Sequence, residues 1–295
     1  MTTSMFEGFT QHTIDVAGVE LHVRLGGSGQ PLLLLHGYPQ TGAMWHRVAP
    51  DLAKRYQLVI PDLRGYGASA KPPAGDDFAG YSKRTMAQDM VGLMAQLGFS
   101  QFALAGHDRG ARVAYRLALD HPSSVDKLVI MDVVPTLEQF ESLGWRGSLF
   151  GYHWYFLAQP PPLPETLIGH EPELFLRTAM SNWAGDMAAL EPAFDEYLAA
   201  FTPDTIRASC DDYRAGARID TELDGQDREA GRRITCPTLV LWGEAHRQRP
   251  EILATWQRWA TNVRGRGLPC GHFLPEEAPA AVVADMLEFL SEAPA

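Results

Sequence analysis

Five consecutive residues with the sequence Gly-His-Asp-Arg-Gly constrain this chain more than any other feature. They lie between an apolar run at residues 102–105, which predicts a buried strand, and a helical pattern at residues 110–120. Gly106 and Gly110 allow a turn so tight that larger side chains would clash with the strand or the helix. The motif therefore predicts a strained strand-to-helix turn that lifts the central residue, Asp108, above the strand end.

Short apolar runs alternate with helical patterns on both sides of this turn. Strands are expected at residues 19–25, 31–35, 57–61, 102–105, 127–131 and 238–242, and near Val263. Helices are expected at residues 44–55, 82–97, 110–120, 250–259 and 278–291. The alternation predicts an α/β fold with a mostly parallel sheet and helices on both faces.

A different pattern occupies residues 136–233, where no apolar strand run occurs and Trp, Tyr, Phe and Pro are frequent. This composition favours a helical insertion that covers the sheet. We therefore expect a core domain made of residues 1–135 and 234–295, and a helical cap domain, or lid, made of residues 136–233.

Composition excludes several classes of partner. The chain has 295 residues, 45% of them hydrophobic, and a formal net charge of -11, which argues against nucleic acid and anionic membrane surfaces. No apolar run is long enough to span a membrane, and residues 1–13 do not resemble a signal peptide. The scattered cysteines Cys210, Cys236 and Cys270 have no metal-ligand spacing. We expect a cytoplasmic protein that needs no metal.

An acid and a histidine follow the turn in a meaningful order. Asp132 comes directly after the strand at residues 127–131, and His272 follows a glycine near the end of the chain. Nucleophile, acid and histidine in this order are typical of the α/β-hydrolase fold, which we predict here. Asp108 as a plain helix N-cap and His272 as a surface residue are the competing interpretations. Glu244 competes with Asp132 because it follows the next strand.

A carboxylate nucleophile selects the chemistry. Attack on an acyl carbon would give an anhydride, whereas attack on a saturated carbon gives an ester that can be hydrolysed. The substrate should therefore carry a halide or an epoxide oxygen on a tetrahedral carbon. We expect His272 to activate water against this ester and Asp132 to orient the imidazole. The backbone N–H groups of Tyr38 and Arg109 are the expected oxyanion donors.

Two arginines beside the nucleophile indicate an anionic substrate. Arg109 and Arg112 are three residues apart and so share a helix face, where their guanidinium groups could hold a carboxylate. The alternative is that each arginine pairs with a protein acid.

Several stretches resemble the fluoroacetate dehalogenases of the α/β-hydrolase superfamily. They are residues 36–41, 106–112, 115–122, 131–136, 153–160, 212–217 and 271–273. The resemblance implies that His153, Trp154 and Tyr213 of the cap hold the departing halide, that Trp183 lines the pocket, and that the protein is a homodimer. Trp154 and Tyr213 as ordinary cap core remain the alternative.

The chain also departs from this family at Gly42, where a histidine is usual, at Ala111, where glycine is common, and at residues 244–250, which look shorter and more basic. We expect hydrolytic dehalogenation of a small 2-haloacid such as fluoroacetate, with water and without a metal or organic cofactor. An epoxide hydrolase that uses Tyr152 and Tyr213, and a receptor that binds a small acid without turnover, are the alternatives.

Overall fold

The computed structural model describes residues 5–245 and 251–292. Within these ranges the centre is one eight-stranded sheet with the order β1-β2-β4-β3-β5-β6-β7-β8. The strands are β1 (Thr10–Val16), β2 (Val19–Gly27), β3 (Gln30–Leu35), β4 (Tyr56–Pro61), β5 (Phe102–His107), β6 (Val125–Met131), β7 (Thr238–Gly243) and β8 (Val263–Leu268). β2 pairs antiparallel with β1 and β4, and every other pair is parallel. The predicted mostly parallel sheet is confirmed.

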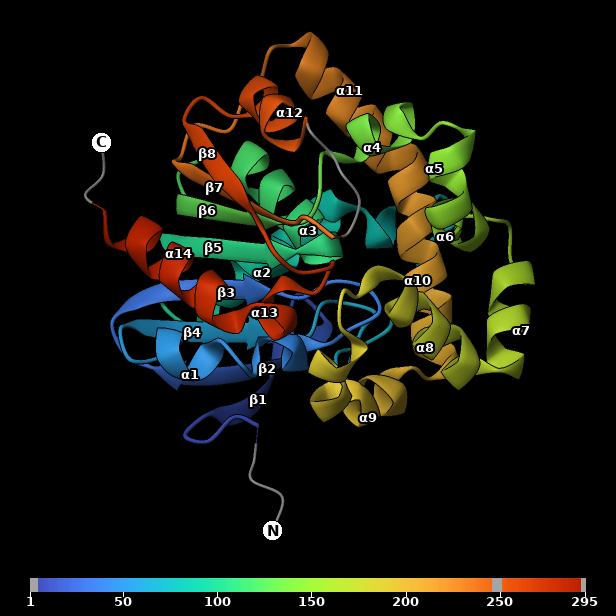
Figure 1. Cartoon of the computed structure of the whole chain (residues 1–295), viewed down its shortest axis with the longest axis horizontal. Helices are drawn as coiled ribbons and strands as arrows, with labels where there is room; N and C mark the ends of the chain where they lie inside the picture. Colours follow the sequence, from blue (N-terminus) through green and yellow to red (C-terminus); the bar gives the residue numbers. More distant parts are fainter. Residues whose placement is uncertain (1–4, 246–250, 293–295) are drawn as a thin grey trace.

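Helices cover both faces of this sheet (Figure 1). Helices α1 (Ala49–Leu52) and α14 (Pro279–Ser291) lie on one face, and α2 (Lys83–Gln96) and α3 (Asp108–Asp120) lie on the other. The remaining core helices are α12 (Ile252–Trp259), α13 (Leu274–Glu277) and the 3-10 helices η1 (Gly42–Trp45) and η2 (Ala79–Tyr81). Helix α2 begins after Ser82, whose side chain accepts the N–H of Thr85 and so caps the helix.

The continuous helix expected at residues 44–55 is wrong. The chain instead forms the 3-10 helix η1 (Gly42–Trp45) and, after a short break, the single turn α1. Pro50 explains the break, because it has no N–H to donate and is tolerated only in the first turn of a helix.

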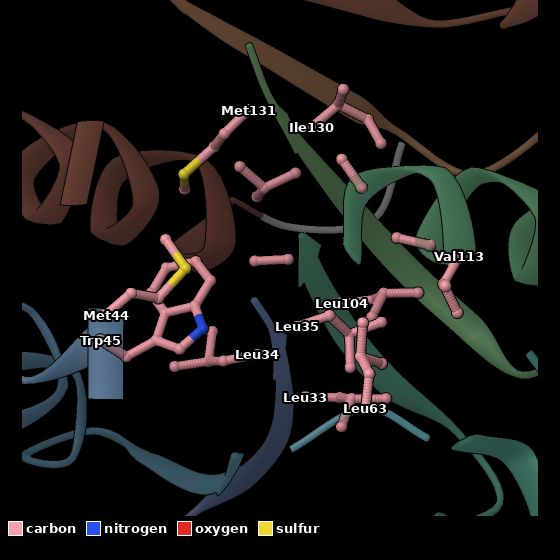
Figure 2. Packing of buried hydrophobic residues seen from close by; sticks show 14 of the residues in the cluster. Leu33, Leu34, Leu35, Met44, Trp45, Leu63, Leu104, Val113, Ile130 and Met131 are labelled. Atoms are coloured by element: carbon pink, nitrogen blue, oxygen red, sulfur yellow. The ribbon is translucent and has the colours of Figure 1, made fainter. Parts of the chain in front are cut away.

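The core lies between the sheet and its helices. Leu33 of β3 and Leu104 of β5 are register partners, and both are fully buried. Figure 2 shows them in one packed cluster with Val113 of α3. Full burial of a leucine stabilises the fold by about 1.5–3 kcal/mol, so this cluster holds β5 and α3, which flank the turn, in place.

Helices alone are described between β6 and β7 within residues 136–233, and we call this segment the cap. They are α4 (Thr136–Ser142), α5 (Trp145–Phe150), α6 (Tyr152–Leu157), α7 (Leu163–His170), α8 (Pro172–Trp183), η3 (Met187–Ala189), α9 (Glu191–Ala200), α10 (Pro203–Ala215), the π-helix η4 (Gly216–Asp220) and α11 (Thr221–Glu229). They lie beyond one end of the strands, at the right of Figure 1. In the described part of the chain, no helix combines the length and apolar character that crossing a membrane requires.

Candidate active site

The parallel strands end at the edge of the sheet that faces the cap. Asp108 and Asp132 come directly after β5 and β6, which are neighbours in the sheet. Carboxyl ends of adjacent parallel strands meet at one edge, where ligands bind in open α/β sheets. The two carboxylates predicted from the sequence therefore come from the same edge.

The turn at Asp108 is as tight as the motif predicts. The backbone of Asp108 is left-handed, with φ 46°. A Cβ atom on Gly106 would lie 2.6 Å from the carbonyl oxygen of Gly110, and one on Gly110 would lie 2.3 Å from the carbonyl oxygen of His36. Only glycine fits at either position, and the strain at Asp108 is held by the packed strand and helix around it.

The carboxylate of Asp108 is held in an ionised state. The N–H of Tyr38 donates to its Oδ1 at 2.9 Å, and Nε2 of His272 lies 3.8 Å from its Oδ2. Burial opposes the charge, but His272 and the nearby guanidinium groups outweigh burial and lower the pKa of Asp108. The carboxylate is thus available as a nucleophile at neutral pH.

His272 pairs with Asp132. Its Nδ1 lies 2.5 Å from Oδ2 of Asp132, while the N–H of Gly243 donates to Oδ1 at 2.9 Å. Burial would lower the pKa of His272, but the hydrogen bond and charge of Asp132 prevail and raise it. Asp132 also has a left-handed backbone, with φ 56°. The competing acid, Glu244, is exposed at the end of β7, so the structure brings Asp132 to the histidine.

A second histidine supports the first, and the sequence analysis assigned it no role. Nε2 of His107 donates to the carbonyl oxygen of His272 at 2.7 Å, and the two rings lie 4.5 Å apart. Burial and the neighbouring His272 lower the pKa of His107 to about 3, so the ring is neutral and can act as a fixed donor. The only indication of this role in the sequence was the position of His107 inside the turn motif.

A small cavity of about 40 Å³ lies between these core residues and the cap. Its lining consists of Asp108, Arg112, Asp132, Val133, Gln139, Gly151, His153, Trp154, Trp183, Tyr213 and His272. The volume equals roughly three water molecules, which suits a substrate of few atoms. Sequence reasoning missed Val133, Gln139 and Gly151 because neutral side chains without a motif carry no chemical signal. Within residues 5–245 and 251–292, no three His, Cys, Asp or Glu side chains gather as a metal site.

The two predicted arginines occupy different places. Arg112 lines the cavity, and its Nη1 donates to the carbonyl oxygen of Val134 at 2.9 Å and to Thr136 at 3.2 Å. Arg109 lies behind the lining residues, where its Nε and Nη2 donate to the carboxylate of Asp212 at 3.0 and 2.5 Å. The alternative of pairing with a protein acid therefore applies to Arg109, and that acid is buried.

Aromatic rings from the cap form the opposite wall. The ring centroids of Trp154 and Tyr213 lie 5.4 Å apart, and those of His153 and Trp183 lie 4.5 Å apart. Among the residues that the structure describes, neither the indole N–H of Trp154 nor the hydroxyl of Tyr213 has a hydrogen-bond partner, although both residues are buried and line the cavity. Donors left open toward a cavity are suited to an acceptor that arrives with the substrate.

Two of the departures, Gly42 and Ala111, lie away from this lining. Gly42 is buried, and a Cβ there would lie 3.1 Å from Arg24 and 3.2 Å from Asp62, so a larger residue would require these side chains to shift. Ala111 is buried in the first turn of α3. Of residues 244–250, those at 246–250 lie outside the described residues.

Comparison with known proteins places this geometry in a family. Residues 30–279 match the alpha/beta hydrolase fold family, and the chain belongs to it. The fluoroacetate dehalogenase of Burkholderia sp is 45% identical, over 98% of this chain and 96% of that protein. This confirms the resemblance that the motifs indicated.

Two further relatives are similar along nearly their full length. The soluble epoxide hydrolase of Corynebacterium sp. (strain C12) is 34% identical, over 96% of this chain and 97% of that protein. A solved structure assigned to the alpha/beta hydrolases, from Nostoc sp PCC 7120, has a TM-score of 0.94 and 48% identity, and the match covers 97% of this chain and 99% of that one.

Proposed function

We propose that this protein hydrolyses the carbon–halide bond of small 2-haloacids, with fluoroacetate as the first candidate. One observation carries the proposal: an ionised carboxylate, an arginine, and the hydrogen-bond donors of Trp154 and Tyr213 line the same small cavity. The carboxylate suits attack on saturated carbon, the arginine suits an acid group, and the donors suit a leaving anion. The similarity to a fluoroacetate dehalogenase supports this assignment.

The first step forms an ester on Asp108. A carboxylate oxygen attacks C2 of the haloacid, and the halide leaves with the electron pair of the carbon–halogen bond. Arg112, with Arg109 behind it, holds the carboxylate of the substrate. His153, Trp154 and Tyr213 line the cavity and receive the halide, and hydrogen bonds from their side chains would stabilise its developing charge. Water supplies the second reactant and no cofactor is needed.

The second step hydrolyses that ester. His272 takes a proton from water, and the oxygen attacks the carboxyl carbon of Asp108. The tetrahedral intermediate carries a negative oxygen that the N–H of Tyr38, already 2.9 Å from Oδ1 of Asp108, and the N–H of Arg109 are suited to stabilise. Asp132 stabilises the imidazolium form of His272 through its 2.5 Å contact. The intermediate then collapses with cleavage of the bond between this carbon and the substrate oxygen, which takes the proton of the new carboxyl group. The hydroxyacid leaves, Asp108 is again a carboxylate, and His272 returns its proton to water.

The test is halide release from fluoro-, chloro- and bromoacetate, measured with ion-selective electrodes together with an assay for glycolate. We expect equal amounts of halide and glycolate from the wild type. The variant His272→Asn should release halide once and retain a carboxymethyl ester on Asp108, visible in the intact mass and in a peptide containing residue 108. Absence of halide release from all three acids would contradict the proposal.

An epoxide hydrolase is the second candidate, and the open hydroxyl of Tyr213 favours it because such a group could protonate an epoxide oxygen. The similarity to a soluble epoxide hydrolase supports this possibility. Tyr152, the expected second tyrosine, is 38% exposed and does not line the cavity. Arg112 also favours an acid. Diol formation from small epoxides without halide release from haloacids would select this candidate.

We also propose that the protein is a homodimer joined through the cap. Large apolar side chains are exposed on α5, α7 and α8, which is unusual for a monomer surface. They are Trp145, Leu149, Phe150, Leu163, Leu167 and Leu174. Light scattering on the wild type and on Leu167→Glu tests this, and a monomeric wild type would contradict it.

The three cysteines are free, which supports a reducing compartment such as the cytoplasm.

A further inference from the structure

Four buried charged side chains join the core to the cap behind the cavity. They are Lys83 at the start of α2, Arg109 on α3, Asp212 on α10 and Asp220 in η4, and none is more than 2% exposed. The ammonium of Lys83 contacts Oδ1 of Asp212 and lies 3.6 Å from Oδ2 of Asp220. Two positive and two negative charges balance, as burial of charged groups requires.

Asp212 occupies one edge of the Arg109 guanidinium. Its carboxylate accepts hydrogen bonds from Nε and Nη2 of Arg109, and its carbonyl oxygen accepts a second hydrogen bond from Nη2 at 2.9 Å. The hydroxyl of Tyr66 donates to Oδ2 of Asp212 at 2.6 Å and fixes the carboxylate from the other side. The orientation of the guanidinium is therefore determined by several hydrogen bonds at once.

The remaining nitrogen of Arg109 is left open. Its Nη1 is buried, and no atom of residues 5–245 or 251–292 forms a hydrogen bond with it. A buried donor on a charged group is costly to leave unpaired, so the site is suited to an additional acceptor. The guanidinium carbon lies 4.2 Å from the ring of Tyr213 and 5.4 Å from that of Trp154, and both rings line the cavity.

The π-helix gives the guanidinium its space. Helix α10 changes to π geometry at Gly216, and such turns are frequent at functional sites. A Cβ atom on Gly216 would lie 3.2 Å from Nη2 and 3.6 Å from Nη1 of Arg109. The guanidinium would have to shift by a few tenths of an ångström to accommodate this atom, which changes where Nη1 lies while the bonds to Asp212 can be kept. The same turn brings Asp220 to the start of α2, where its Oδ1 accepts the N–H of Lys83 at 2.8 Å.

We propose that Asp212 and Gly216, supported by Lys83, are positioning residues that offer Nη1 of Arg109 to the carboxylate of the substrate. This inference rests on the proposed function, because it assigns the second of two cationic contacts for the acid. Arg112 then supplies the contact at the cavity surface, and Arg109 supplies the contact between the aromatic rings. Anion affinity consequently depends on a helix turn that does not line the cavity itself.

The test compares Gly216→Ala with the matched control Gly225→Ala, whose new Cβ would meet only Leu137 at 3.9 Å. Gly216 has ordinary helical angles, φ -57° and ψ -45°, so alanine should not lower the melting temperature. We expect the KM for fluoroacetate to rise about tenfold in Gly216→Ala, with kcat changed less than about threefold, and no change in the control. An unchanged KM, or a KM that rises only together with a loss of thermal stability, would overturn the proposal.

A second readout separates this inference from the proposed function. Acetate binding, followed by calorimetry, requires no turnover, and we expect it to weaken about tenfold in Gly216→Ala and in the shape-preserving variant Asp212→Asn. A wild type that binds acetate but releases no halide contradicts the proposed function alone. Variants that bind acetate as tightly as the wild type contradict the positioning role, whatever the reaction is.

Discussion

The two walls of the cavity are built in different ways. On the core wall, each catalytic residue has a hydrogen bond that involves a main-chain group: the N–H groups of Tyr38 and Gly243 donate to the carboxylates of Asp108 and Asp132, and the side chain of His107 donates to the carbonyl oxygen of His272. On the cap wall, Trp154 and Tyr213 are held by contacts between rings and by guanidinium groups against their faces.

This difference separates two tasks. Main-chain hydrogen bonds fix the core wall within narrow limits, as a two-step reaction on one carboxylate requires. Ring packing fixes the position of the cap aromatics but leaves their polar ends open to the cavity. We infer that the core wall determines the type of reaction and the cap wall determines which leaving group is accepted. Four experiments can break or sharpen this division.

The largest effect is expected from removing the nucleophile on the core wall. Asp108→Gly deletes the carboxylate and suits the left-handed backbone at φ 46°. Halide release should fall at least about 10⁴-fold while the melting temperature stays equal or rises. The measurements are an ion-selective electrode and a thermal melt. Activity within tenfold of the wild type would show that position 108 does not carry the reaction.

Loss of the cavity arginine should have the next largest effect. Arg112→Leu removes the charge that lines the cavity, and we expect kcat/KM for chloroacetate to fall about 10²- to 10³-fold. The neutral chloroacetamide is the control substrate, because it has no carboxylate to lose. Its reaction, followed by chloride release or by alkylation of residue 108, should fall less than about tenfold. Equal losses for both compounds would mean that Arg112 acts only in packing.

A smaller and more selective effect is expected on the cap wall. Tyr213→Phe keeps the ring, and with it the 5.4 Å contact with Trp154, but removes the hydroxyl. Fluoride depends more on hydrogen bonds than larger halides do, so turnover of fluoroacetate should fall about 10- to 100-fold and that of bromoacetate less than about threefold. Parallel steady-state assays measure the ratio. An equal loss of turnover for fluoroacetate and bromoacetate would show that the cap wall does not select the leaving group.

The smallest effect concerns a buried acid where the walls meet. Glu276 of α13 is fully buried. Its carboxyl group accepts hydrogen bonds from the side-chain amide of Gln40 in the core at 2.5 Å and from the hydroxyl of Tyr197 in the cap at 2.8 Å. Burial raises the pKa of Glu276 to about 8, despite the two hydrogen bonds and Arg47. The neighbouring Glu277 adds to this rise. The native state thus holds a proton that the unfolded chain has already released at neutral pH.

Because the native state binds more protons, the free energy of unfolding should fall as the pH rises through this raised pKa. Between pH 7 and 9 the loss should be about 1 kcal/mol, and Glu276→Gln should remove it. Urea unfolding at the two pH values provides the measurement, with the wild type as the reference. The same pH dependence in both proteins would assign the effect to other groups.

The core wall could be predicted from the sequence because its signals are local. Each of its residues follows an apolar strand or a glycine turn, and parallel strands bring those ends together wherever they lie in the chain. The choice between Asp132 and Glu244 needed the structure, since both follow strands. The prediction of one helix at residues 44–55 was wrong because it relied on apolar spacing and gave too little weight to Pro50.

The surroundings of the cap wall were less predictable. The partner of Arg109 is 103 residues away in the sequence, and no periodic pattern links it to Asp212. Glutamate is usually exposed, yet Glu276 is 0% exposed. Buried polar groups depend on which elements pack together, and the arrangement of short helices in the cap is not specified by local spacing.

The left-handed backbones of Asp108 and Asp132 have a practical consequence for anyone who engineers this protein. Directed evolution for heat tolerance would reward glycine or asparagine at both positions, because those residues relax the turn, and it would thereby enrich inactive molecules. Libraries should keep these two codons fixed and look for gains elsewhere, for instance at Ala17, another non-glycine residue with a positive φ, in the tight connection between β1 and β2.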